Sequence, residues 1–179
     1  MSFGYSLLMV RGPHDENAFN KRFRPTKAQE TDWLICEFTR GAFPDGIFEG
    51  EELVCANVVE LASEVVYIGG ESSQDQFHYE HVIDSEVVRK LVYSSDGCET
   101  TWISVEGTEE PWEAGIFFSE HSMQRVLDIY DDDRKAKLEP ELKSAWAEHR
   151  YGLEKTWPSC DATVGFVVAK SFGIDIEKL

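Results

Sequence analysis

The 179-residue sequence lacks the long apolar runs that mark membrane proteins. No stretch approaches the roughly 18 consecutive apolar residues of a membrane span. The opening residues MSFGYSLLMVRG contain only a short apolar run and no basic start, which is not the pattern of a signal peptide. We therefore expect no membrane span and a cytoplasmic location.

Closely spaced cysteines are also missing. Cys36, Cys55, Cys98 and Cys160 are far apart and form no C-x-x-C pair. This spacing matches neither a zinc ribbon nor a small disulfide framework. We expect reduced thiols that are mostly buried.

Several motifs that bind cofactors or carry catalysis do not occur. There is no G-x-x-x-x-G-K-[ST], G-x-G-x-x-G, H-E-x-x-H or G-x-S-x-G sequence. A calcium loop that began at Asp131 would need an oxygen ligand at position 135 and a glycine at 136, where the chain has Lys135 and Ala136. We expect no cofactor and no metal, and interpret the aspartates at 131–133 as a fraying helix end.

Basic residues are scarce, and this is the strongest global signal. The chain has 17 Lys and Arg against 34 Asp and Glu, a net charge of −17 at pH 7. Residues 1–40 are nearly neutral, with six basic and five acidic side chains, whereas residues 41–179 have eleven and twenty-nine. Such a surface repels nucleic acid and anionic lipid and attracts basic partners, although it can also serve solubility alone.

The basic cluster lies near the start of the chain. The segment AFNKRFRPTK contains Lys21, Arg22, Arg24 and Lys27, between the strand-like stretches SLLMV and DWLICEFT. We interpret the cluster as a solvated loop or helix face, with a phosphate contact as the alternative.

The middle of the chain predicts one helix followed by a sheet. Apolar residues recur with helical spacing over about 51–63. Four strand-like runs with short connections follow, which predicts an antiparallel meander over about 65–106. If DSE is a three-residue loop, Tyr79 faces Leu91 and Glu80 faces Lys90.

The stretch DQFHYEHVID holds two histidines and a glutamate within four positions. Because side chains of a strand alternate between its faces, His78 and Glu80 should share one face and His81 should lie on the other. The three side chains should not converge on one metal ion. We expect a cross-strand ion pair and two ordinary strand histidines.

The C-terminal third predicts helices. We expect helical starts at Pro111, at Ser119 as a cap, and at Pro140, the last helix burying Leu142, Ala145, Trp146 and either His149 or Leu153. The stretch 161–172 fits a helix capped by Asp161 and stopped by Gly173, although its valines also fit a strand.

Cys160 is the candidate nucleophile. In WPSCDATVG its thiol would lie near a helix N-terminus, which favours the thiolate, and His149 could act as its base. Asp161 would oppose that shift. The alternative is a buried cysteine that packs as a small apolar residue.

The candidate binding surface is VEGTEEPWE. Trp112 stands among four carboxylates, those of Glu106, Glu109, Glu110 and Glu113. An exposed tryptophan framed by negative charge suits an interface with a basic protein. The alternative is that Trp112 closes the core where the sheet meets the helices.

These observations predict one α+β domain over residues 1–179, with a mainly antiparallel sheet packed by helices at about 51–63 and in the C-terminal third. The function expected first is that of a non-enzymatic acidic binding protein, such as an inhibitor or immunity-type partner of a basic protein. The alternatives are a small hydrolase or transferase using Cys160 with a histidine, and a small-ligand-binding domain.

Overall fold

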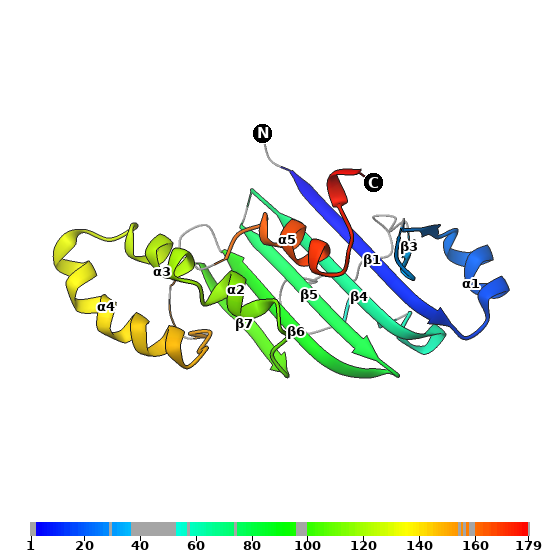
Figure 1. Cartoon of the computed structure of the whole chain (residues 1–179), viewed down its shortest axis with the longest axis horizontal. Helices are drawn as coiled ribbons and strands as arrows, with labels where there is room; N and C mark the ends of the chain where they lie inside the picture. Colours follow the sequence, from blue (N-terminus) through cyan, green and yellow to red (C-terminus); the bar gives the residue numbers. More distant parts are fainter. Residues whose placement is uncertain are drawn as a thin grey trace.

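The computed structural model describes residues 3–28, 30–36, 53–56, 58–73, 75–95, 100–153, 155, 157 and 160–178. Within them the chain forms a seven-stranded antiparallel sheet in the order β2-β3-β1-β4-β5-β6-β7 (Figure 1). The strands are β1 (Gly4–Pro13), β2 (Thr26–Lys27), β3 (Leu34–Cys36), β4 (Ala62–Glu71), β5 (Gln76–Ile83), β6 (Glu86–Ser95) and β7 (Thr100–Gly107). The predicted α+β class with an antiparallel sheet is confirmed.

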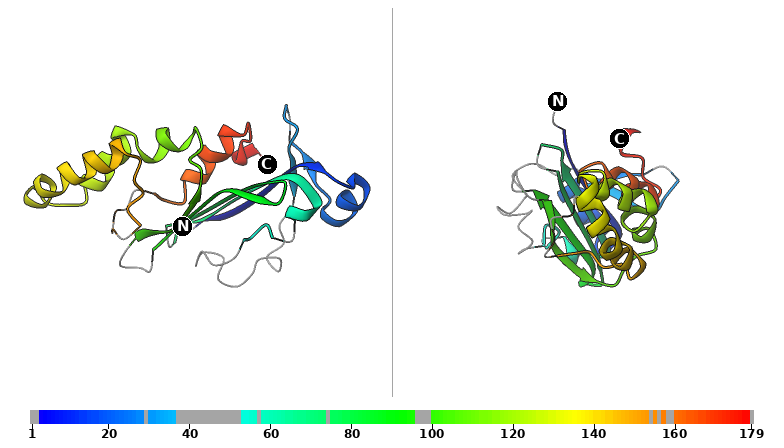
Figure 2. Two further views of the ribbon diagram at one scale, coloured as in Figure 1. Left: turned by 90° about the horizontal axis from the view of Figure 1, so that it is seen from below. Right: turned by 90° about the vertical axis from the view of Figure 1, so that its left-hand side faces the viewer.

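Most of the helical segments follow the sheet in the chain. The α-helices are α1 (Glu16–Phe23), α2 (Glu113–Phe117), α3 (Glu120–Leu127), α4 (Asp132–Ala147) and α5 (Val164–Ser171), with the 3-10 turns η2 (Val59–Leu61) and η3 (Ile176–Lys178). Seen edge-on, α2 and α5 lie over one side of the sheet, and residues 53–56 and 58–61, which we call the segment before β4, lie on the other (Figure 2, left). No helix in the described residues is long and apolar enough to cross a membrane.

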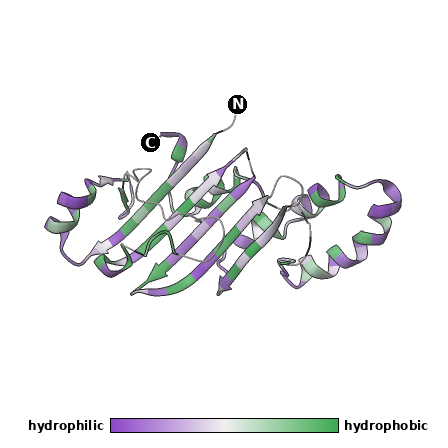
Figure 3. Ribbon diagram, turned by 180° about the vertical axis from the view of Figure 1, so that it is seen from behind, coloured by the Kyte–Doolittle hydropathy of each residue, from purple (hydrophilic) through white to green (hydrophobic). Residues whose placement is uncertain are grey.

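Each side of the sheet has its own apolar core. Alternating residues of β1, β4, β5 and β6 pack against α2 and α5, where Phe117 and Val168 are buried. The intervening residues pack against α1 and the segment before β4, where Phe19, Val54 and Val58 are buried. Figure 3 shows hydrophobic stretches along the strands of the sheet. Both faces of the central strands are thus covered.

The predicted meander is confirmed, since β4 to β7 pair in sequence order. The expected pairs Tyr79 with Leu91 and Glu80 with Lys90 are present. The turn itself differs, because Asp84 and Ser85 form a two-residue loop, both with positive φ, of 49° and 66°. A bulge between His81 and Val82 then restores the expected register.

The expected helix over 51–63 is wrong for its described part, where only η2 is helical and Ala62 already belongs to β4. Residues 51, 52 and 57 lie outside the described residues. Val54 and Val58 are buried, as the apolar pattern required. A turn laid against the sheet buries the same residues as a helix would, so periodicity alone did not distinguish the two.

The expected C-terminal helices are present, but three of their starts differ from the prediction. α2 begins at Glu113 and not at Pro111. α5 begins at Val164 after Thr163, so Asp161, whose side chain accepts the Thr163 amide, is not its cap. Ser119 caps α3 by accepting a hydrogen bond from the Ser122 amide, and α5 is a helix. However, α4 begins eight residues before Pro140, because the Asp131 side chain caps it through the Arg134 amide. Asp131 is therefore a helix start and not a fraying end.

The buried residues of α4 were predicted in part. Leu142, Ala145 and Trp146 are buried in a separate cluster with α3. His149 and Leu153 are both exposed, because the helix ends at Ala147 and the chain turns away.

Candidate functional site

A cluster of charged side chains surrounds His81 on the α2 side of the sheet. Its Nδ1 lies 2.5 Å from Glu110 Oε1 and its Nε2 lies 3.0 Å from Glu64 Oε1. The three side chains are 10–13% exposed. One imidazole ring thus links β4 to the loop between β7 and α2. We call Glu64, His81 and Glu110 the His81 latch.

Local sequence explains how the latch assembles. His81 and Tyr79 are two residues apart on β5, so both face α2, and Glu64 lies diagonally across on neighbouring β4. Glu110 arrives from the far edge of the sheet, three residues after β7 ends. Its Oε2 accepts hydrogen bonds from the Tyr79 hydroxyl at 2.7 Å and from the Trp112 indole at 2.5 Å.

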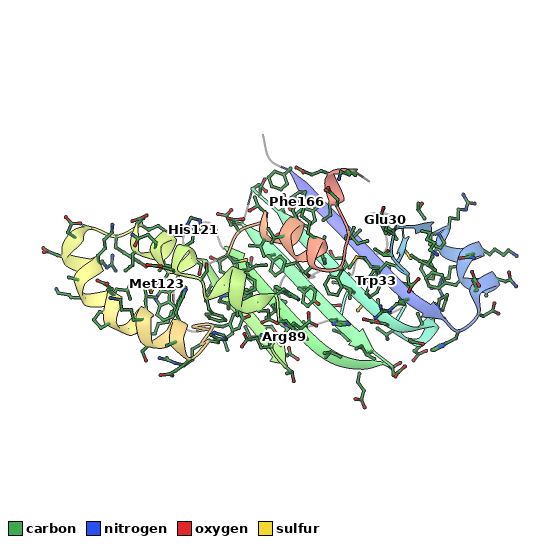
Figure 4. The ribbon with its side chains drawn as sticks, in the orientation of Figure 1. Glu30, Trp33, Arg89, His121, Met123 and Phe166 are labelled. Atoms are coloured by element: carbon green, nitrogen blue, oxygen red, sulfur yellow. The ribbon has the colours of Figure 1, made fainter. Side chains whose placement is uncertain are left out.

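A second ion pair fastens the start of α2. The Arg89 guanidinium on β6 (labelled in Figure 4) donates to both oxygens of Glu113, at 2.8 and 2.6 Å. Both side chains are buried, at 4% and 0% exposed. The Tyr151 hydroxyl also donates to Glu113, and Glu113 Oε1 accepts the Glu110 amide at 2.8 Å. This bidentate pair is directly adjacent to the latch.

The electrostatics of the latch favour a charged histidine. Burial opposes the charge on His81, but the hydrogen bonds and negative charges of Glu110 and Glu64 outweigh it and raise the pKa of His81 above its usual 6.5. Burial likewise opposes ionisation of Glu110, but hydrogen bonds from His81 and Tyr79 lower the pKa of that carboxyl. An imidazolium that donates at both nitrogens cannot accept a proton, so His81 is unsuited to act as a general base.

On the opposite face, Glu80 holds the segment before β4. Its carboxylate accepts the backbone amides of Val54 at 2.9 Å and Cys55 at 3.1 Å. His78 Nε2 lies 2.7 Å from the same carboxylate, and the Cys55 thiol donates to it at 2.9 Å. Burial opposes ionisation of Glu80, yet these hydrogen bonds lower its pKa. Glu80 is thus a buried anchor for a turn 25 residues earlier in the chain.

The predicted division of DQFHYEHVID between two faces therefore holds in the structure. His78 and Glu80 share one face, and His81 lies on the other. Within the described residues, no group of three or more His, Cys, Asp or Glu side chains is arranged to hold a metal ion.

The carboxylates predicted around Trp112 separate into two kinds. Glu106 and Glu109 are exposed, whereas Glu110 and Glu113 bind His81 and Arg89. Trp112 is half-buried, and its ring contacts those of Tyr79 and Phe117 edge-on. In this structure Trp112 lies against the core where the sheet meets α2.

Cys160 and His149 have separate surroundings. Cys160 is 3% exposed and packs in the core beside α5, and burial together with the charge of Asp161 holds the pKa of its thiol well above the usual value. His149 is exposed, stacks on Phe118 and lies 2.7 Å from Glu109. A thiol with a raised pKa carries little thiolate and is a poor nucleophile.

Two hollows lined by described residues are small. One of about 170 Å³ lies between α1 and η2, beside Phe19 and Arg22, and one of about 250 Å³ lies along α4 beside Tyr130. Both are below the roughly 300–1,000 Å³ usual for small-molecule sites.

The four basic residues of the predicted cluster, Lys21, Arg22, Arg24 and Lys27, are all exposed on α1 and the segment after it.

Sequence reasoning did not identify Glu64, Arg89 or Tyr151 as members of a site. Arg89 could have been found from the register, because it faces α2 on a central strand where an isolated charge is costly and requires a partner. Tyr151 carries no comparable signal, since it comes from a segment without regular structure.

Comparison with known proteins gives no further guidance: no family model, no curated protein and no solved structure matches the chain.

Proposed function

We propose that the protein is a non-enzymatic acidic binding protein that receives a basic protein, in the manner of an inhibitor or immunity-type partner. The main support is the charge distribution. Residues 41–179 carry an excess of eighteen negative charges, the difference between twenty-nine acidic and eleven basic side chains. The buried position of Cys160 also favours binding over nucleophilic chemistry.

The proposed contact surface is the end of β7 and the loop after it. Glu106 and Glu109 are exposed there, and Ile103 on the same edge strand is 42% exposed. An apolar contact beside carboxylates suits a partner with basic residues around an apolar centre. Glu110, Trp112 and Glu113 support this corner from inside the protein.

The test is a pull-down from the native cytoplasm at low and high salt, followed by binding kinetics with the captured protein. At low salt we expect a basic protein to be retained, and its association should slow as ionic strength passes about 0.15 M, where the Debye length is about 8 Å. The double variant Glu106→Gln with Glu109→Gln should mainly slow association, because exposed charges act on the rate of encounter.

The matched control is Glu16→Gln with Glu30→Gln, which removes the same charge from two exposed residues of the nearly neutral segment. That control should bind at close to the original rate. Equal slowing in both variants would place the contact elsewhere. Retention of no basic protein at low salt would leave solubility as the role of the negative charge, and the proposed function would be abandoned.

A further inference from the structure

The His81 latch connects two parts of the chain that lie far apart in the sequence. His81 and Glu64 belong to the central sheet, whereas Glu110 belongs to the loop that carries Trp112. Through Glu110, the histidine holds the β7–α2 loop against the sheet. The Trp112 indole is bound to the same carboxylate oxygen that accepts the Tyr79 hydroxyl.

The geometry requires a charged ring. A neutral imidazole has one N–H and can satisfy one carboxylate, whereas the imidazolium has two and can satisfy both. Here both ring nitrogens lie within 3.0 Å of a carboxylate oxygen. Loss of one proton would leave the lone pair of one nitrogen facing an anion in a poorly solvated place.

The surrounding charges balance only when His81 is protonated. The charged groups that face it or its partners come from β1, β4, β6, the β7–α2 loop and the first residue of α2, while Tyr79 and Phe172 contribute uncharged rings. They are three carboxylates, Glu64, Glu110 and Glu113, and three cations, Arg11, Arg89 and His81 itself. Deprotonation leaves one uncompensated negative charge beneath the loop.

We infer that the His81 latch is a pH-sensitive switch: with His81 protonated it fastens the β7–α2 loop and Trp112 to the sheet, and loss of that proton releases the loop. This inference stands independently of the proposed function. It needs no partner, because the switch lies within the chain.

The direction of the pH effect follows from the two ionising groups. The pKa of His81 is raised on folding, so its contribution is fully present below about 6.5 and is lost as pH rises through the folded value. The pKa of Glu110 is lowered, so its contribution is present above about 4.5 and is lost as pH falls through its own folded value. The latch is therefore tightest in weakly acidic solution.

The test follows the indole N–H signal of Trp112 by NMR hydrogen exchange, corrected for intrinsic base catalysis, from pH 6 to 9. We expect its protection to fall by up to about tenfold per pH unit as pH rises from about 6.5 to the folded-state pKa of His81, and to level off above that pKa. The Trp146 indole is an internal control, since it donates to the Ser122 hydroxyl at 3.0 Å in a separate cluster. Its protection should stay constant.

Two variants assign the effect to His81. His81→Gln should abolish the pH dependence at Trp112, whereas His121→Gln, at an exposed histidine of α3, should leave it unchanged. If His81→Gln does not fold, Glu64→Gln serves instead: removing one carboxylate lowers the pKa of His81 and should move the transition to lower pH. Equal behaviour of Trp112 and Trp146, or an unmoved transition in Glu64→Gln, would overturn the switch.

Discussion

The buried Glu113 carboxylate is the residue on which the attachment of α2 to the sheet most depends. Glu113→Gln keeps its shape but leaves the Arg89 guanidinium buried without a negative partner. We expect the free energy of unfolding to fall by about 3–5 kcal/mol, the usual cost of breaking a buried ion pair from one side. Urea denaturation measures this directly.

The control is the exposed pair of Lys143 and Glu139 on α4, whose side chains are 60% and 45% exposed. Glu139→Gln should cost less than about 1 kcal/mol, because solvent screens that pair. The double variant Arg89→Met with Glu113→Leu should be more stable than Glu113→Gln alone, since it leaves no unpaired charge at these two positions. A double variant as unstable as the single one would show that packing, and not charge, governs the site.

At the residue scale, the sequence predicted the face of the sheet on which a side chain lies better than it predicted which residues that side chain binds. The two faces of DQFHYEHVID followed from the strand period of two, and Glu80 does lie opposite Lys90. However, the carboxylate of Glu80 binds the amides of Val54 and Cys55, a contact that depends on how a distant turn folds back. No local pattern encodes such a contact. For the same reason, the contact between His81 and Glu110 could not be predicted from the sequence.

At the scale of elements, the packing of α5 depends on a glycine. A Cβ on Gly165 would overlap the Tyr5 hydroxyl, which donates to the Ala162 carbonyl at 2.5 Å. Gly165→Ala should therefore destabilise the protein by about 1–3 kcal/mol in thermal or urea unfolding, despite the better helix propensity of alanine. β1 and α5 can approach this closely because residue 165 has no side chain.

Gly115 in α2 is the matched control, because a Cβ there would meet nothing within 4 Å. Gly115→Ala should stabilise by about 0.5–1 kcal/mol through propensity alone. In a Tyr5→Phe background, Gly165→Ala should cost less but still destabilise, because the overlapping hydroxyl is gone while the ring carbons that a Cβ would meet at 2.5 and 2.6 Å remain. If the two glycine variants changed stability in the same direction, the proposed contact would not be what constrains Gly165.

Elements with a strong period or a clear cap were predicted well, and the others were not. The meander and the Ser119 cap were both present as expected. The start of α4 was misplaced because proline was preferred as a first helical residue, although the Asp131 cap lies nine residues before Pro140 and the helix contains Pro140 in its interior. The helical spacing over 51–63 correctly indicated that residues such as Val54 and Val58 are buried, but it did not predict the backbone conformation of the segment.

For the whole molecule, the net charge of −17 at pH 7 implies self-repulsion that salt should relieve. Raising NaCl from about 0.02 to 0.2 M shortens the Debye length from roughly 20 Å to below 10 Å, so charges on separate elements stop interacting. We expect the unfolding midpoint at pH 7 to rise by about 2–4 °C, equivalent to roughly 1 kcal/mol for a chain of this length.

The same titration at pH 5 separates self-repulsion from specific ion pairs. Near the sequence pI of about 4.6 the net charge is small, so salt has little repulsion left to screen. The buried pair of Arg89 and Glu113 is poorly screened at either pH. Calorimetric midpoints should therefore depend clearly on salt at pH 7 and only weakly at pH 5. Equal slopes at the two pH values would mean that the acidic side chains do not repel one another enough to affect folding, and that their negative charge acts only on what approaches from outside.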